Sequence, residues 1–166
     1  MERTIKFQIQ MKTKDLWQFS MYHSYRGMMG LFAAVFTCAA LYYVIGSWTA
    51  LSGSQRTAMI FVALMFPVLQ PLMLYWKARK QIRQPAMQSL IGLEFKEEGL
   101  SVTQLEQEAL FPWDEIGRVE QKTTMLIIYM DRIHAYLLPK EVYVDRVQEL
   151  SDFLHRQLPK ERLRRI

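Results

Sequence analysis

Residues 27–48 of the chain read GMMGLFAAVFTCAALYYVIGSW and contain no charged side chain. Residues 57–76 read TAMIFVALMFPVLQPLMLYW and contain none either. As α-helices rising about 1.5 Å per residue, these segments would be roughly 33 and 30 Å long, which matches the hydrocarbon thickness of a bilayer. A chain of 166 residues is too small to bury two helices that are apolar on every side. The sequence therefore predicts two transmembrane helices.

The rest of the composition excludes several other classes of protein. The single cysteine, Cys38, rules out an intrachain disulfide framework and a cysteine-rich zinc site. The mean hydropathy of −0.04 is an average of the two uncharged segments and their charged flanks. The first apolar segment is too long for the core of a signal peptide, and no small-residue cleavage site follows it. We therefore expect it to be retained as a membrane helix.

Positive charge is unevenly distributed around the two apolar segments. The flanks that precede the first segment and follow the second are basic, through Arg3, Lys6, Lys12, Lys14, Arg26, Lys77, Arg79, Lys80 and Arg83. The connection between the two segments carries only Arg56. Because Lys and Arg are retained on the cytoplasmic side of a membrane, we expect both termini to be cytoplasmic and the connection to be external.

Residues 1–26 predict a strand followed by a short amphipathic helix before the membrane. Polar residues alternate with four apolar ones, Ile5, Phe7, Ile9 and Met11, which is the pattern of a half-buried strand. An isolated strand is not stable, and this one lies on the same side of the membrane as the residues after the second helix. We therefore expect residues 1–26 to join the cytoplasmic domain. The transmembrane hairpin, residues 27–76 with helices at 27–48 and 57–76, is then an insertion.

Residues 84–158 predict an antiparallel sheet closed by one helix. Short hydrophobic strands recur between Leu93 and Leu138, with a tight turn at Asp131-Arg132. Four apolar residues then recur at helical spacing: Val147, Leu150, Leu154 and Leu158. We expect Asp145 to cap this helix, with Gln148 as its capping-box partner. Residues 159–166 are expected to form a basic tail.

Several short motifs in this region resemble those of the YcxB-like bacterial membrane proteins. They are Leu93-Glu94-Phe95, Gly99-Leu100, Trp113-Asp114-Glu115-Ile116, Val119-Glu120 and Tyr136-Leu137-Leu138-Pro139-Lys140. The resemblance implies a membrane α-helical hairpin of two transmembrane helices plus an α+β cytoplasmic domain. That domain would be similar to a pleckstrin-homology (PH) domain, with an antiparallel sheet and a C-terminal helix. The resemblance also implies a multi-pass protein of the bacterial inner membrane, and it implies no catalytic residues.

Two features of the predicted membrane helices concern partners. Small residues form one face of the first helix: Gly27, Gly30, Ala33, Thr37 and Ala40. This face packs against the second helix in one interpretation, and against a homo-oligomer or another membrane protein in the other. In the second helix, Pro67 and Pro71 predict a kink, and Gln70 is expected to hydrogen bond to a neighbouring helix or to a membrane partner.

The basic residues suggest contact with lipid headgroups. Residues 85–158 carry seven Lys/Arg against thirteen Asp/Glu, so the excess positive charge lies outside this folded segment. Anionic lipids as partners explain this distribution, whereas an acidic body argues against nucleic acid. Headgroup contacts are expected for Lys77, Arg79, Lys80, Arg83, Arg162, Arg164 and Arg165. Trp113 is interpreted either as a core residue or as an aromatic anchor for a partner.

The sequence contains no pattern typical of a catalytic, cofactor or metal site. His23, His134 and His155 lack metal-ligand spacing, and there is neither a nucleophile elbow nor a glycine-rich phosphate loop. Cys38 lies within a predicted membrane helix, where a small apolar packing role is expected. We therefore expect a protein that is not an enzyme and that holds no cofactor.

Three functions are compatible with these features. The leading hypothesis is a non-enzymatic inner-membrane interaction protein, an accessory or regulatory subunit that binds a membrane protein partner. One alternative is an immunity protein against a secreted toxin that acts at the inner membrane. The other is an anionic-lipid-sensing module.

Overall fold

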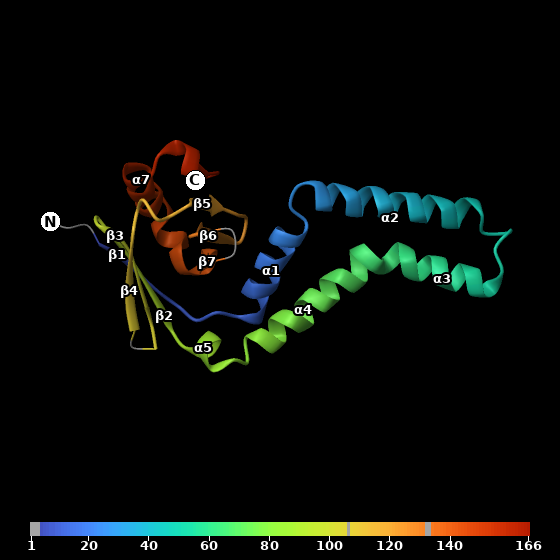
Figure 1. The fold of residues 1–166 in the computed structure, drawn as a ribbon, viewed down its shortest axis with the longest axis horizontal. Helices are drawn as coiled ribbons and strands as arrows, with labels where there is room; N and C mark the ends of the chain where they lie inside the picture. The colour runs from blue at the N-terminus through green and yellow to red at the C-terminus, as the bar shows by residue number, and fades with distance from the viewer. Residues whose placement is uncertain (1–3, 106, 132–133) are drawn as a thin grey trace. The chain divides into compact units, whose positions relative to one another are not determined.

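The computed structural model describes residues 4–105, 107–131 and 134–166, and these fall into two compact units (Figure 1). The sheet unit comprises Met1–Asp15 and Arg83–Ile166, and the hairpin unit comprises Leu16–Ile82. The segments before and after the hairpin thus fold together, and the hairpin is an insertion between them.

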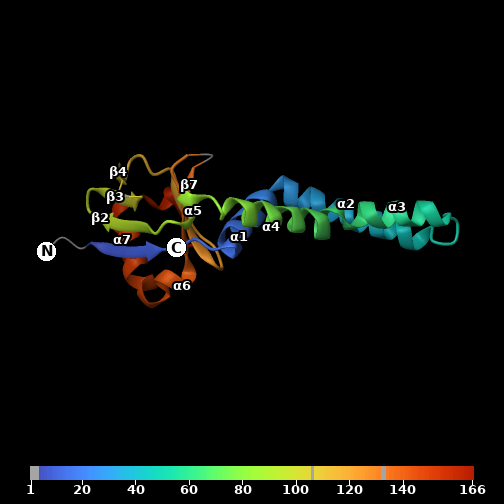
Figure 2. The same cartoon turned by 90° about the horizontal axis from the view of Figure 1, so that it is seen from below.

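The hairpin unit is entirely helical. Its helices are α2 (Met28–Gly46), α3 (Gly53–Leu64), the π-helical turn η1 (Met65–Leu69) and α4 (Gln70–Gln81). The last three follow one another as a single helix that is interrupted by the π turn, and α2 lies beside α3 in both views (Figures 1 and 2). The described part of the chain therefore contains two helices that are long and apolar enough to cross a membrane, Met28–Gly46 and Gly53–Gln81.

The ends of these helices differ from the predicted bounds, 27–48 and 57–76. The second helix begins at Gly53 because Ser52 and Gln55 form a capping box, in which each side chain accepts the other residue's backbone N–H. It continues past Trp76 to Gln81 because lysine and arginine are good helix formers. The predicted bounds were the limits of the uncharged segments. The ends of a helix depend instead on capping side chains and on the helix propensity of the residues that follow.

The helix before the hairpin, α1 (Thr13–Ser24), crosses the boundary between the units. Its first residues belong to the sheet unit, where the Asp15 carboxylate accepts the Lys12 backbone N–H at 2.9 Å. From Leu16 onward the helix belongs to the hairpin unit. This differs from the expectation that all of residues 1–26 join the cytoplasmic domain.

The first sheet has four antiparallel strands in the order β1-β2-β3-β4. They are β1 (Ile5–Ile9), β2 (Ile91–Lys96), β3 (Gly99–Gln104) and β4 (Gln107–Pro112). β1 pairs with β2 so that Ile5 lies opposite Phe95 and Ile9 opposite Ile91. The alternation in β1 has the predicted effect, since Ile5, Phe7 and Ile9 are buried and the residues between them are exposed.

The second sheet contains β7-β6-β5-β8 in that order, and its last pair is parallel. Its strands are β5 (Arg118–Gln121), β6 (Met125–Tyr129), β7 (Ala135–Pro139) and β8 (Leu163–Arg164). β8 and the short helix η3 (Lys160–Arg162) occupy the segment predicted to be a basic tail. That segment is part of the fold. In the predicted turn, Arg132 and the following Ile133 lie outside the described residues.

Helix α7 (Val147–Gln157) closes the core of the sheet unit with Leu150, Phe153 and Leu154, which are buried. The predicted cap at Asp145 is wrong. Asp145 lies in the 3-10 turn η2 (Val144–Arg146), which continues directly into α7 and leaves no side-chain cap. Two further short helices are α5 (Pro85–Gln88) and α6 (Lys140–Tyr143).

Gly99 permits the close pairing of β3 with β4, which suggests a test of the fold. A Cβ atom at Gly99 would lie 2.3 Å from the carbonyl oxygen of Phe111, so Gly99→Ala has to push the strands apart. We expect a loss of about 1–3 kcal/mol in the free energy of unfolding of the sheet unit. The matched control is Gly92→Ala, whose Cβ would make an ordinary 3.4 Å contact with Thr103. Fluorine NMR of Trp113, the sheet unit's one tryptophan, follows urea unfolding, and equal midpoints for the two variants would contradict the prediction.

Candidate functional site

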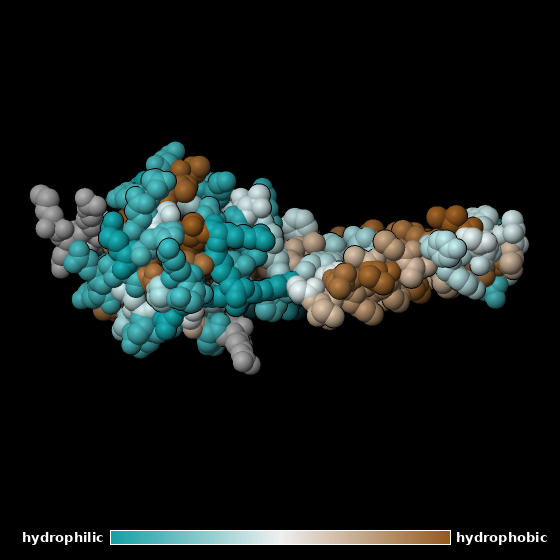
Figure 3. Space-filling view, turned by 90° about the horizontal axis from the view of Figure 1, so that it is seen from above, coloured by the Kyte–Doolittle hydropathy of each residue, from teal (hydrophilic) through white to brown (hydrophobic). Residues whose placement is uncertain are grey.

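Large apolar side chains are exposed on the hairpin, and those on one face form the brown patches in Figure 3. Only 17% of the most apolar window of α2 and 6% of that of the second helix are buried. More than a third of the surface is exposed for Met28, Met29, Val35, Tyr42, Ile45, Phe61, Val68, Met73 and Trp76. A core helix of a soluble protein is mostly buried, and these two helices differ from it in exposing a large apolar surface, which is typical of a contact surface.

The small residues of α2 lie on the face that contacts α3 and η1. Ala33 and Ala40 are buried, Gly30 and Thr37 are half-buried, and Gly27 is exposed just before the helix. On the facing helix, Ala63 is buried as well. Within this chain, the small-residue face is therefore occupied by contacts inside the hairpin.

Gly30 has a second and local reason to be small. A Cβ atom at this position would lie 2.2 Å from the carbonyl oxygen of Tyr25. The chain turns sharply between α1 and α2, and the backbone at Tyr25 folds back against the first turn of α2. Gly30 thus allows the corner that brings α1 toward the second helix.

The second helix is broken where the two prolines predicted a kink. In the π turn η1, the backbone N–H of Gln70 donates to the carbonyl of Met65, five residues earlier. The next N–H in this pattern would serve the carbonyl of Phe66, but the next residue is Pro71 and has none. The hydroxyl of Tyr25 donates to that carbonyl instead, at 2.5 Å.

A second contact from α1 lies one turn further along the broken helix. The indole Nε1 of Trp17 donates to the carbonyl oxygen of Pro71 at 3.0 Å, and its ring meets Tyr75 edge-on at 6.3 Å. Gln70, predicted to bond to a neighbour, lies half-buried at the junction of η1 and α4. The sequence did not predict the hydrogen bonds of Tyr25 and Trp17 to the second helix. The available signal was the presence of aromatic side chains with a donor group near a helix that contains two prolines. These contacts explain why most of α1 belongs to the hairpin unit.

The predicted headgroup residues divide into two groups. Lys77, Arg79 and Lys80 on α4 are exposed, and so is Arg83 at the start of the sheet unit. Arg162 differs from the expectation, because its guanidinium donates to the carbonyls of Trp113, Asp114 and Ile116 at 3.0–3.3 Å. It fastens the C-terminal segment to the loop before β5. Arg164 and Arg165 remain exposed.

Trp113, considered as an anchor for a partner, lies in the core with 9% of its surface exposed. Its indole Nε1 donates to the carbonyl of Lys96 at 3.0 Å. Its ring packs between Phe95 at 6.4 Å and Phe153 at 5.9 Å, and so links the first sheet to α7. A side chain held in this way is a packing element of the sheet unit.

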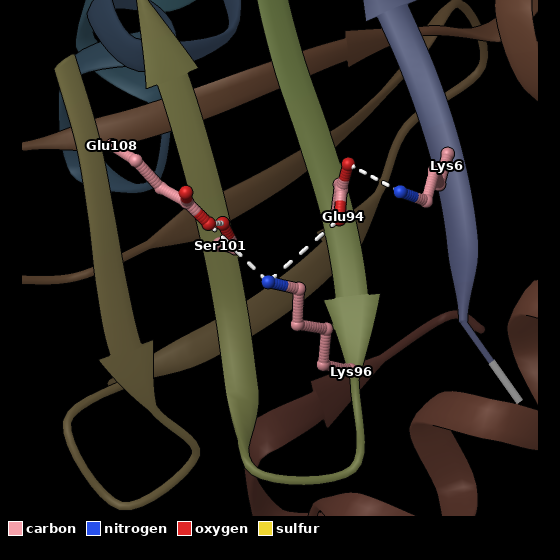
Figure 4. Close-up of polar contacts among 5 residues, drawn as sticks. All are labelled: Lys6, Glu94, Lys96, Ser101 and Glu108. Carbon is pink, nitrogen blue, oxygen red and sulfur yellow. Dashed lines mark hydrogen bonds and ion pairs between the residues drawn. The ribbon is translucent and has the colours of Figure 1, made fainter. Parts of the chain in front are cut away.

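One face of the first sheet carries a row of alternating charges (Figure 4). Lys6 Nζ lies 2.8 Å from Glu94, and Lys96 Nζ lies 3.8 Å from Glu94 and 3.2 Å from Glu108. Hydrogen bonds from Ser101, at 2.6 Å, and from Lys96 hold the pKa of Glu108 below its usual range. Two lysines balance two carboxylates, so the row has no excess charge with which to attract a charged ligand.

The described residues contain no group of three or more His, Cys, Asp or Glu side chains that could hold a metal ion. The three histidines make separate local contacts: His23 with the Phe19 ring, His134 with Asp131, and His155 with the Ser151 carbonyl. Cys38 is exposed on α2.

The hydrogen bond at the break can be tested by replacing one oxygen. Tyr25→Phe leaves the Phe66 carbonyl without this donor, and we expect the hairpin to lose about 1 kcal/mol of stability. Tyr42→Phe is the control, since that side chain is 82% exposed. Unfolding of the micelle-bound protein by sodium dodecyl sulfate, followed by circular dichroism, measures both variants. Identical curves for Tyr25→Phe and the wild type would show that the bond is energetically neutral.

Comparison with known proteins places one segment of the chain in a family. Residues 95–154 match the family model described as YcxB-like protein. The match runs from Phe95 in β2 to Leu154 in α7, so it contains Phe95, Trp113 and Phe153, whose rings contact one another in the core. No curated protein and no solved structure matches the chain. The resemblance found in the sequence is thus confirmed over residues 95–154, the segment that is similar to the YcxB-like family.

Proposed function

We propose that the chain is a non-enzymatic interaction protein of the bacterial inner membrane, an accessory or regulatory subunit that binds a membrane protein partner. The hairpin crosses the bilayer twice, and the sheet unit lies in the cytoplasm with both termini. The sheet unit has a PH-like fold, and its role is binding.

Insertion in a membrane is supported by the surface of the hairpin. Exposing its large apolar side chains to water would be unfavourable by roughly 25 cal/mol for every Å² of apolar surface. The ends of the apolar region are marked by residues that suit an interface. At the connection, the Arg56 guanidinium lies 5.0 Å from the centre of the Trp48 ring, and at the other end Tyr75 and Trp76 precede Lys77.

The observation that carries the proposed topology is the pairing of β1 with β2. These strands lie on either side of the hairpin in the sequence and form one antiparallel ladder from Ile5–Phe95 to Ile9–Ile91. Two strands can pair only on the same side of a membrane. The pairing therefore supports an even number of crossings, and the basic residues of α4 favour the cytoplasm for that side.

A PH-like fold for the sheet unit is supported by the order of its elements. Four antiparallel strands are followed by three antiparallel strands and then by the helix α7, which packs on the core through Phe153. The parallel strand β8 is an addition at the edge of the second sheet. A fold of this kind presents strand edges and loops for binding, but fold alone does not define a partner.

A partner in the membrane has to use the hairpin surface that remains exposed. The face of α2 that contains Ala33 and Ala40 is occupied by α3 and η1. On another face, the exposed residues Ala34, Cys38, Leu41 and Ile45 follow one another at helical spacing. Its two small residues, four positions apart, would allow a partner helix to approach closely.

The topology predicts which positions react with a membrane-impermeant thiol reagent. In a Cys38→Ala background, Thr49→Cys in the connection should react in intact cells depleted of their outer membrane. Ser89→Cys in the sheet unit should react only after lysis. Labelling of both positions from the outside, or of neither, would contradict two crossings.

The partner surface predicts a difference between two adjacent residues of α2. A photo-crosslinking amino acid at Leu41 lies on the stripe with Ala34 and Cys38, whereas one at Tyr42 lies about 100° further around the helix. Irradiation of native membranes should give one discrete protein adduct for Leu41 and mainly lipid adducts for Tyr42. Mass spectrometry identifies the adduct. Lipid adducts alone at both positions would contradict a partner on this face of α2.

A further inference from the structure

The whole net charge of the chain resides in the hairpin unit. Residues 16–82 contain five Lys/Arg and no Asp or Glu. The other 16 Lys/Arg residues lie in the sheet unit together with all 16 Asp/Glu residues of the chain. The formal net charge of +5 is therefore a property of the hairpin, and the sheet unit is neutral by count.

Within the hairpin unit, three of the five cations lie in a single turn of α4. Successive residues of a helix are about 100° apart, so Lys77 and Arg79 flank Ala78 and Lys80 lies on the opposite side. The three Cα atoms differ in height by only about 4.5 Å. Ala78 is 2% exposed, while the three cations are exposed. The charges thus form a collar at one level of the helix, interrupted only at Ala78.

The collar lacks the counter-charges that occur elsewhere. In the sheet unit, Lys6 and Lys96 contact carboxylates on the first sheet, and Lys12 contacts Glu141. Among the described residues, Lys77, Arg79 and Lys80 form no ion pair with a carboxylate. These cations are therefore available to anions outside the chain.

The exposed side chains of α4 change in character toward the collar. The exposed surface of α4 changes along its axis from apolar Leu72 and Met73, through the aromatic Trp76, to the collar. This sequence of side chains follows the change from hydrocarbon through the interface to the headgroup layer. A collar suits a plane of phosphate groups around a helix, whereas a single soluble anion would need cations gathered on one side.

We propose that the collar of Lys77, Arg79 and Lys80 binds the headgroups of anionic phospholipids in the cytoplasmic leaflet. The hairpin thereby selects its lipid neighbours. The inference rests on the membrane insertion proposed above and adds the ligand class and its residues. It leaves out Arg162, which is engaged with backbone carbonyls. The lipid contact is electrostatic, so each cation should contribute about 1 kcal/mol, or roughly fivefold in association.

The test measures lipid selection by the full chain in phosphatidylcholine vesicles. Electron spin resonance of tracer lipids gives the association of spin-labelled phosphatidylglycerol relative to spin-labelled phosphatidylcholine. The wild type should prefer phosphatidylglycerol several-fold at 0.1 M salt and lose most of this preference at 1 M, where the screening length falls to about 3 Å. The variant Lys77→Gln/Arg79→Gln/Lys80→Gln should show no preference, and Lys77→Gln alone should show a reduced one.

A matched variant separates the collar from net charge. Lys160→Gln/Arg164→Gln/Arg165→Gln removes the same three charges from exposed residues of the sheet unit, and it should keep the wild-type preference. Lys77→Arg/Lys80→Arg should keep it too. No preference in the wild type, or equal loss in the two triple variants, would overturn the proposal. Labelling of Thr49→Cys in the same vesicles reports insertion, so a failure of the collar is distinguished from a failure of the proposed topology.

Discussion

The arrangement of the hairpin unit depends on one backbone carbonyl. Pro71 has no N–H, so the carbonyl of Phe66 has no donor from its own helix at the point where the π turn ends. An unpaired carbonyl in apolar surroundings is unfavourable, and the hydroxyl of Tyr25 supplies the missing donor. Tyr25 can reach it because Gly30 allows the corner between α1 and α2. A defect in one helix therefore fixes the position of another, and that helix leads directly to β1.

Charge separates the two units as clearly as packing does. In the sheet unit, cations and carboxylates are equal in number, and lysines such as Lys6 and Lys96 form ion pairs with carboxylates on neighbouring strands. The hairpin unit contains five Lys/Arg residues and no Asp or Glu that could balance their charge. The basic C-terminal residues looked similar to the α4 cluster in the sequence. The structure distinguishes them, since Arg162 binds carbonyls and β8 extends a sheet.

The sequence predicted those parts of the fold that depend on repetition. Two uncharged segments, the alternation from Ile5 to Ile9 and the apolar face of α7 each extend over several residues and predicted their elements. The π turn, the cap at Ser52 and the corner at Gly30 each depend on one atom in a particular place. Trp113 could be interpreted in two ways because burial depends on Phe95 and Phe153, which are distant in sequence. The contacts of Tyr25, Trp17 and Arg162 also join residues that are distant in sequence, and no local sequence pattern predicts them.

The pairing of β1 with β2 has a consequence for how the protein is made. Ile9 and Ile91 are paired although 81 residues separate them, and the ribosome completes the entire hairpin before β2 exists. In the proposed topology, a chain in which only one of the two helices had inserted would hold β1 and β2 on opposite sides of the bilayer. β2 would then be an open edge, and the core would lack Ile5, Phe7 and Ile9. In the proposed topology, closure of the first sheet therefore requires both crossings of the membrane, because only then do β1 and β2 lie on the same side.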